Sequence, residues 1–256
     1  MGATIAVVTG AAGDIGRAIS ARLARDHDIV VLADRDLAAA ERAAAALGPD
    51  FVPMALDVTD PAACDAFAAR VAGMGALQTL VNNAGGVQAE SLQSTAAAQW
   101  AMDRALNLDA VFYLFSALAD QLKATQGAVV NIASVNGFGV YGHPAYSAAK
   151  AGMIHLTRLI AVEYGKFGIR ANAVAPGTVR TQAWEARAAA NPDVFREAAA
   201  HYALGRIARA EDVAEAVGFL ASPLAAAITG VTLPVDCGLT AGIPALARTF
   251  SQSADY

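Results

Sequence analysis

Short apolar runs rich in valine and isoleucine alternate along this chain with longer stretches of helical spacing. The runs are TIAVVTG, DIVVLAD, FVPMALDV, LQTLVNNAG, GAVVNIAS, IRANAVAPG and VTLPVDCG. Strands joined by helical crossovers run parallel, and the helices pack on both faces of the sheet. The alternation therefore predicts an α/β fold with a doubly wound, seven-stranded parallel sheet and helices on both faces.

No linker, repeat or low-complexity tract divides the chain, so we expect residues 1–256 to form a single domain. The rhythm breaks at residues 178–209, where TVRTQAWEARAAANPDVFREAAAHYALGRIAR adds helical material. We call this segment the excursion. An insertion beside the carboxyl ends of strands typically covers a ligand crevice, and the alternative is a surface hairpin without a role.

Composition narrows the class of partner. The formal net charge is −5 and no long basic block occurs, which argues against nucleic acid and anionic membrane surfaces and favours a small molecule. No apolar run is long enough to span a bilayer and the sequence lacks a secretory signal, which predicts a cytoplasmic protein. Two distant cysteines and four scattered histidines indicate neither a disulfide framework nor a metal site.

A glycine-rich turn, TGAAGDIG, joins the first strand to the first helix. Gly10, Gly13 and Gly16 let the backbone approach a phosphate, which free amides and the helix dipole then stabilise. Asp34 ends the second strand about 20 residues later, where an acid bonds the ribose of NAD and repels the 2′-phosphate of NADP. Arg35 beside it leaves NADP open, and capping of the next helix is the alternative role for Asp34.

A second constellation lies in NIASVNGFGVYGHPAYSAAK. Tyr146 and Lys150 are four residues apart, so on a helix they share one face. We expect the ammonium to lower the pKa of the phenol and to make Tyr146 a general acid or base. Ser134, at the end of the preceding strand, can face Tyr146 across the crevice. The alternative is an ordinary amphipathic helix with a surface tyrosine and lysine.

With TGAAGDIG, NNAG, YSAAK and PGTVRT in this order, the chain resembles the classical short-chain dehydrogenase/reductase family over nearly its whole length. The resemblance implies a Rossmann-type fold, an NAD(P) cofactor and a homotetramer. It implies catalytic roles for Asn107, Ser134, Tyr146 and Lys150, with Asn107 holding a water for a proton relay. It implies a cofactor site made of Gly10, Gly13, Asp14, Ile15, Gly16, Asp34, Arg35, Asp57, Val58, Asn83, Ala84, Gly85, Tyr146, Lys150, Pro176, Gly177, Val179 and Thr181.

The substrate is expected to contact Ser134, Asn136, His143 and Tyr146. Other residues that flank the predicted crevice are Gln88, Arg180, Gln182, Trp184, Arg187 and Tyr202, and several of them are polar or basic. They favour a polar secondary alcohol, such as a sugar, polyol or hydroxy acid, oxidised with NAD. The rivals are an NADPH-dependent ketone or 3-oxoacyl reductase and a dinucleotide-binding protein without activity.

Asp14 departs from the family pattern, which places glycine at this position of the turn. An acid at a helix start accepts amide hydrogen bonds and suits the helix dipole. We therefore expect Asp14 to cap the first helix, with its main chain and that of Ile15 facing the cofactor and its carboxylate turned away from the pyrophosphate. A loop without a basic residue further favours NAD over NADP.

Overall fold

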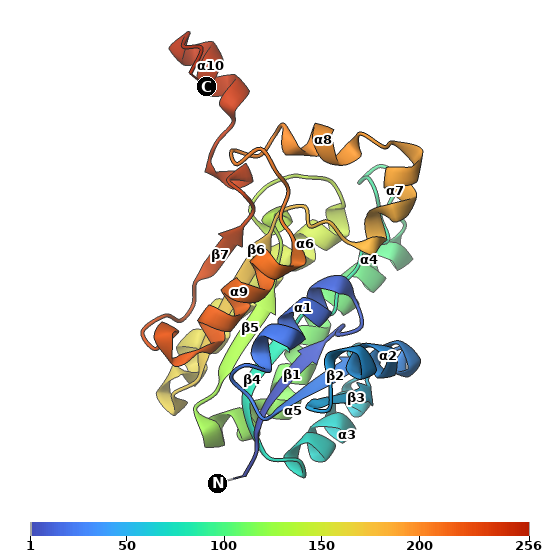
Figure 1. The fold of residues 1–256 in the computed structure, drawn as a ribbon, viewed down its shortest axis with the longest axis vertical. Coiled ribbons are helices and arrows are strands. Elements are labelled where there is room, and N and C mark those ends of the chain that lie inside the picture. The colour runs from blue at the N-terminus through green and yellow to red at the C-terminus, as the bar shows by residue number, and fades with distance from the viewer. Residues whose placement is uncertain (1, 256) are drawn as a thin grey trace.

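The computed structural model describes residues 2–255, apart from the side chains of residues 183 and 185–187. Its sheet has strand order β3-β2-β1-β4-β5-β6-β7, with every neighbouring pair parallel. The strands are β1 (Thr4–Thr9), β2 (Ile29–Asp34), β3 (Phe51–Ala55), β4 (Ala76–Asn82), β5 (Ala128–Ile132), β6 (Arg170–Pro176) and β7 (Thr232–Val235). The predicted seven-stranded, doubly wound parallel sheet is confirmed (Figure 1).

Helices cover both faces of the sheet. In the described part of the chain they are α1 (Asp14–Leu23), α2 (Leu37–Leu47), α3 (Pro61–Ala72), α4 (Ala97–Arg104), α5 (Ala110–Thr125), α6 (Pro144–Tyr164), α7 (Glu185–Ala190), α8 (Val194–Ala199), α9 (Ala210–Ala221) and α10 (Pro244–Ser251). The first core cluster holds residues of α3, α5 and α6, and the second holds residues of α1, α2 and α9. These two sets therefore lie on opposite faces, and Figure 1 shows α1 beside α9.

The strand β1 shows why the central strands are largely apolar. Side chains alternate between the two faces of a strand. Ile5 and Val7 belong to the core under α3, α5 and α6, whereas Ala6 and Val8 belong to the core under α1, α2 and α9. All four are fully buried. A strand covered on both faces has no place for polar alternation, so its sequence reads as a continuous apolar run.

The start of α1 differs from our expectation for Asp14. Gly13 occupies the N-cap position and no side chain caps the helix. Asp14 is the first residue of α1, and its carboxylate pairs with Arg17 and accepts a hydrogen bond from the Gln182 amide at 2.6 Å. The predicted cap of α1 was wrong, because the excursion supplies a backbone donor that competes for the same carboxylate.

The strand order reverses between β1 and β4, since the chain runs outward to β3 and then returns to the other side of β1. Crevices at the carboxyl ends of strands form at such a point. The excursion follows β6 and carries α7 and α8, which lie at one end of the sheet, while α10 projects from that end (Figure 1). Within residues 2–255, no helix is long and apolar enough to cross a membrane.

Candidate active site

A cavity of about 980 Å³ lies at this end of the sheet. Its walls come from the glycine turn, the segments that follow β4, β5 and β6, the start of α6, the excursion and residues 239–245. The predicted site residues that line it are Ile15, Asn83, Gly85, Ser134, Asn136, His143, Tyr146, Lys150, Pro176, Gly177, Val179 and Thr181. Segments far apart in sequence therefore meet around one space.

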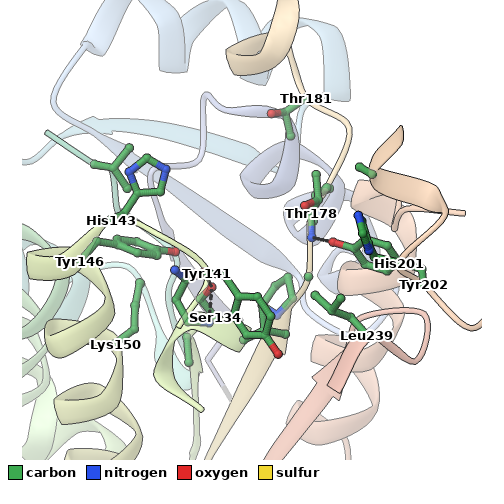
Figure 2. Close-up of a pocket in the computed structure, with 18 of the residues that line it drawn as sticks. Ser134, Tyr141, His143, Tyr146, Lys150, Thr178, Thr181, His201, Tyr202 and Leu239 are labelled. Carbon is green, nitrogen blue, oxygen red and sulfur yellow. Dashed lines mark hydrogen bonds between the residues drawn. The ribbon is translucent and has the colours of Figure 1, made fainter. Parts of the chain in front are cut away.

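The predicted catalytic residues Ser134, Tyr146 and Lys150 share one wall of this cavity, which we call the catalytic wall. Ser134 follows β5, and Tyr146 and Lys150 lie one turn apart on α6. Figure 2 shows the Tyr146 hydroxyl directed toward Ser134, with Lys150 beneath the ring. The Lys150 ammonium lies 5.5 Å from the centre of the Tyr146 ring. It donates a hydrogen bond of 2.7 Å to the Ile132 carbonyl, so β5 fixes its position.

The electrostatics of the catalytic wall correct one expectation. Burial raises the pKa of Tyr146, a hydrogen bond with Ser134 lowers it, and the charge of Asp103 raises it further. The net pKa lies above the ordinary value, contrary to our expectation that Lys150 lowers it. Lys150 is also fully buried, and loss of hydration lowers its pKa to about 7. Near neutral pH its positive charge is therefore partial.

Asn107 lies behind the catalytic wall, where a π-helical turn, Ala105–Asp109, joins α4 to α5. Its side chain is fully buried, donates to the carbonyls of Gly86 and Asp103, and accepts from the Gly86 amide at 3.3 Å. A Cβ on Gly85 would lie 2.9 Å from Asn107 Oδ1 and 3.5 Å from Lys150 Nζ. Both groups thus approach the same glycine.

Sequence reasoning missed Asp103. It is 1% exposed, its Oδ1 accepts a hydrogen bond of 2.9 Å from the Gln88 amide, and its charge acts on Tyr146. Its spacing of four residues before Asn107 places the two on one helix face and was the available signal. The cavity also includes Tyr141, His201, Leu239 and Ile243, for which the sequence carries no local motif.

The glycine turn is shaped for close approach. Gly10 has φ +59°, and a Cβ there would lie 2.9 Å from the Ala84 Cα. Asn83 holds this contact by donating to the carbonyls of Thr9 and Gly10 at 2.9 and 3.1 Å. Backbone from the ends of β1 and β4 therefore lies side by side at the reversal point of the sheet, which is where phosphate groups bind in this class of fold.

Asp34 does not cap α2, because Asp36 accepts the capping hydrogen bond from the Ala39 amide. Instead Asp34 accepts from the Ala12 amide at 3.1 Å and so sits against the glycine turn. Asp57 lies at the neighbouring strand end and accepts from the Thr59 amide and hydroxyl at 2.9 and 2.6 Å. These bonds lower the Asp57 pKa.

Several predicted site residues do not line the cavity. They are the cofactor residues Gly10, Gly13, Asp14, Gly16, Asp34, Arg35, Asp57, Val58 and Ala84, and the catalytic residue Asn107. The close backbone approach at Gly10 and the carboxylate of Asp34 against the turn fit a dinucleotide that runs from the β2 and β3 ends into the cavity.

The substrate side differs in part from expectation. His143 lines the cavity, and its Nδ1 lies 3.0 Å from the Ala89 carbonyl. Because a carbonyl only accepts, Nδ1 is the donor in this contact and Nε2 is the ring nitrogen left for a substrate. Asn136 also lines the cavity, but its amide donates to the Gly142 carbonyl at 2.9 Å and the Ser147 hydroxyl at 3.0 Å. It accepts from Ser134 at 3.2 Å and so holds that residue in place.

Trp184 and Tyr202 of the excursion line the cavity, whereas Gln88, Arg180 and Gln182 do not. The Arg180 guanidinium lies 5.1 Å from the centre of the Phe195 ring, within the excursion. The Tyr202 hydroxyl accepts from the Thr178 amide at 2.9 Å (Figure 2). The side chain of Arg187 lies outside the described residues.

Comparison with known proteins identifies the family to which the chain belongs. Residues 10–240 match the family model described as enoyl-(acyl carrier protein) reductase. A Burkholderia thailandensis oxidoreductase of the short-chain dehydrogenase/reductase family has a structure with a TM-score of 0.93 and 42% identity, covering 100% of both chains. The chain belongs to the short-chain dehydrogenase/reductase family.

Two relatives represent different substrates within this family. Meso-2,3-butanediol dehydrogenase of Serratia marcescens is 37% identical over 93% of this chain and 94% of its own length. The 3-oxoacyl-[acyl-carrier-protein] reductase FabG of Vibrio cholerae is 36% identical over 92% of this chain and 96% of its own length. The chain is therefore an oxidoreductase of this family that uses NAD(P) and a small-molecule substrate.

Proposed function

We propose that the protein is an NAD-dependent alcohol dehydrogenase that interconverts a polar secondary alcohol and its carbonyl. The observation that carries the proposal is the catalytic wall, where Ser134, Tyr146 and Lys150 face one large cavity beside the glycine turn. A scaffold that only bound the dinucleotide would have no use for a buried lysine held under a tyrosine at the substrate side of that cavity.

The chemistry follows from these side chains. The bound nicotinamide dinucleotide supplies the hydride acceptor for oxidation or the donor for reduction. In oxidation Tyr146 Oη accepts the alcohol proton, and in reduction it returns a proton to the carbonyl oxygen. Ser134 donates a hydrogen bond to the oxygen on which charge develops. Because its pKa is raised, Tyr146 holds its proton at neutral pH, so alcohol oxidation is expected to accelerate as the pH rises.

NAD is favoured over NADP by Asp34. Its carboxylate lies against the turn at the Ala12 amide, and a 2′-phosphate brought to that place would meet its charge. The turn itself, residues 10–16, contains no lysine or arginine. The rival is an NADPH-dependent ketone or 3-oxoacyl reductase. The Vibrio relative is a 3-oxoacyl-[acyl-carrier-protein] reductase, and Arg35 beside Asp34 is the residue that favours NADP.

A polyol or vicinal diol is the substrate class that the cavity supports best among sugars, polyols and hydroxy acids. The His143 ring, held at Nδ1 by the Ala89 carbonyl, offers its second nitrogen to a second hydroxyl, while Tyr141, Trp184 and Tyr202 give the cavity aromatic side chains. The name of the Serratia relative, a butanediol dehydrogenase, agrees with this class.

The test is an activity screen that resolves the cofactor. Diols, sugar alcohols, hydroxy acids and 3-oxoacyl thioesters are assayed with NAD(H) and NADP(H) at pH 7 and pH 9. We expect diol oxidation with NAD, faster at pH 9. Preferred reduction of oxoacyl thioesters with NADPH would overturn both the cofactor and the substrate assignment, and absence of turnover with every pair would favour a binding protein.

The proposed enzyme is a homotetramer. Exposed apolar side chains on α5, α6 and β7, such as Phe112, Val162 and Leu233, are available for contacts between copies. Light scattering of the purified protein should give four times the mass of the chain, and a monomer would contradict this assignment.

A further inference from the structure

The carboxylate of Asp14 joins two parts of the molecule that are 168 residues apart. Asp14 opens α1 in the glycine turn, and its Oδ2 accepts a hydrogen bond of 2.6 Å from the Gln182 amide. Gln182 is the first residue of a single helical turn, Gln182–Trp184, with which the helical part of the excursion begins. The side chain therefore caps a turn of the excursion and leaves its own helix uncapped.

This bond joins two segments that border the cavity. Ile15, the residue after Asp14, and Thr181, the residue before Gln182, both line it. A bond between their chain neighbours therefore links the glycine turn to the segment after β6. A dinucleotide held between these two segments would leave more slowly while the bond is made.

Arg17 removes the electrostatic objection to an acid at this place. Its guanidinium pairs with Asp14 Oδ1, one helical turn along α1, while Oδ2 bonds Gln182. The Asp14 side chain is 20% exposed and Arg17 is 40% exposed. One carboxylate oxygen therefore pairs with Arg17 on the same helix, and the other accepts a hydrogen bond from the excursion. The carboxylate is held in place by two partners within the chain.

We propose that Asp14 is a positioning residue that latches the excursion to the glycine turn and slows release of the bound dinucleotide. The part of this proposal that concerns release rests on the proposed function. The latch itself is a property of the folded chain without ligand. The rival explanation is that Asp14 acts only through its charge, in which case removing the charge strengthens dinucleotide binding whether or not the hydrogen bond remains.

Three variants separate the latch from the charge. Asp14→Asn keeps an acceptor for the Gln182 amide and removes the charge. Asp14→Ala removes both, and Asp14→Gly restores the residue type that the family pattern has at this position. Asp193→Asn is the matched control, because Asp193 also pairs with an arginine three residues on, Arg196, but lies on the excursion itself without contacting the glycine turn.

The first measurement is hydrogen exchange of the Gln182 amide in the full-length protein without ligand. A hydrogen bond to the side chain at position 14 slows opening of the amide, so we expect exchange about tenfold faster in Asp14→Ala and Asp14→Gly, which lack an acceptor. Asp14→Asn and Asp193→Asn should resemble the wild type. Unchanged exchange in Asp14→Ala, or equally fast exchange in Asp14→Asn, would overturn the latch.

The second measurement is the NADH dissociation rate, followed by loss of cofactor fluorescence after mixing with excess NAD. The latch predicts that release is about three- to tenfold faster in Asp14→Ala and Asp14→Gly but near the wild-type rate in Asp14→Asn. Slower release in all three would establish the charge explanation instead. If the wild type binds no NADH, the proposed cofactor is wrong, and the exchange experiment still decides whether the latch exists.

Discussion

The catalytic wall and the excursion face the same cavity but are built in opposite ways. Ser134 and Lys150 are 8% and 2% exposed, and Lys150 is hydrogen-bonded to the backbone of β5. In the excursion, α8 contains no buried residue. A group that transfers a proton must be held within hydrogen-bonding distance of its target, so it belongs on packed elements of the scaffold.

The ends of the excursion are anchored in the core by Val179 and Ala208, but its helical part relies on a few separate contacts. The Trp184 and Phe195 rings lie 6.1 Å apart, and Tyr202 bonds the Thr178 amide. Segments with few buried contacts open at low free-energy cost, which suits a part of the protein that substrate must pass. Because their packing differs in this way, we expect the catalytic wall to govern kcat and the excursion to govern substrate affinity.

The substitution expected to have the largest effect is Tyr146→Phe, which removes the one hydroxyl at the catalytic wall assigned to proton transfer. General acid–base catalysis contributes between about 10² and 10⁴ in rate, so we expect kcat to fall by about 10³. The change retains the buried ring, so NADH affinity and thermal unfolding should remain near the wild-type values. Steady-state kinetics with cofactor titration check this. A modest loss of kcat with a large rise in KM would contradict the assignment of kcat to the catalytic wall, because the wall would then act in binding.

Lys150→Met has the next largest expected effect, on stability as well as on activity. Burial lowers the Lys150 pKa from 10.5 to about 7. Between these values the unfolded chain holds the proton and the folded protein does not, so Lys150 costs stability below pH 7 and this cost is relieved as pH rises toward 10.5. The variant should lose most activity and yet gain stability relative to the wild type at pH 6.

Urea unfolding at pH 6 and pH 9 measures this stability difference. We expect the advantage of Lys150→Met to shrink by at least about 1.4 kcal/mol, the value of one pKa unit, between the two pH values. Lys166→Met is a surface control for which no such change is expected, because Lys166 is exposed. An advantage that is constant with pH would show that Lys150 has an ordinary pKa in the folded protein.

The sequence predicted the parts of the molecule that arise from local patterns. The seven parallel strands follow from the apolar runs, and helix spacing brings Tyr146 beside Lys150 whatever the rest of the chain does. Asp103 was within reach of the same reasoning, because it lies one turn before Asn107. The position of Asp34 against the glycine turn also follows from strand order, since β1 and β2 are neighbours.

Other features depend on contacts that no local pattern encodes. The raised Tyr146 pKa results from burial by several elements, which outweighs the lowering by the hydrogen bond with Ser134. The Asp14 carboxylate bonds an amide 168 residues away, so a rule about helix caps assigned it to the wrong helix. Gln88 and Arg180 lie beside site motifs in the sequence but do not line the cavity, whereas Tyr141 and Leu239 do.

The smallest expected effect belongs to Tyr202→Phe, which tests most directly whether the excursion acts on substrate affinity and not on kcat. Tyr202 is 6% exposed, and its hydroxyl accepts the Thr178 amide next to the cavity-lining Gly177 and Val179. The phenylalanine keeps the packing and leaves that amide without its acceptor, a loss of about 1 kcal/mol. We expect KM for the alcohol to rise about three- to fivefold with kcat nearly unchanged.

The matched control for removal of a tyrosine hydroxyl is Tyr113→Phe, because Tyr113 lies on α5 and outside the cavity. A fall in kcat of tenfold or more in Tyr202→Phe would mean that the excursion positions the reacting groups. The two regions would then not govern separate kinetic constants.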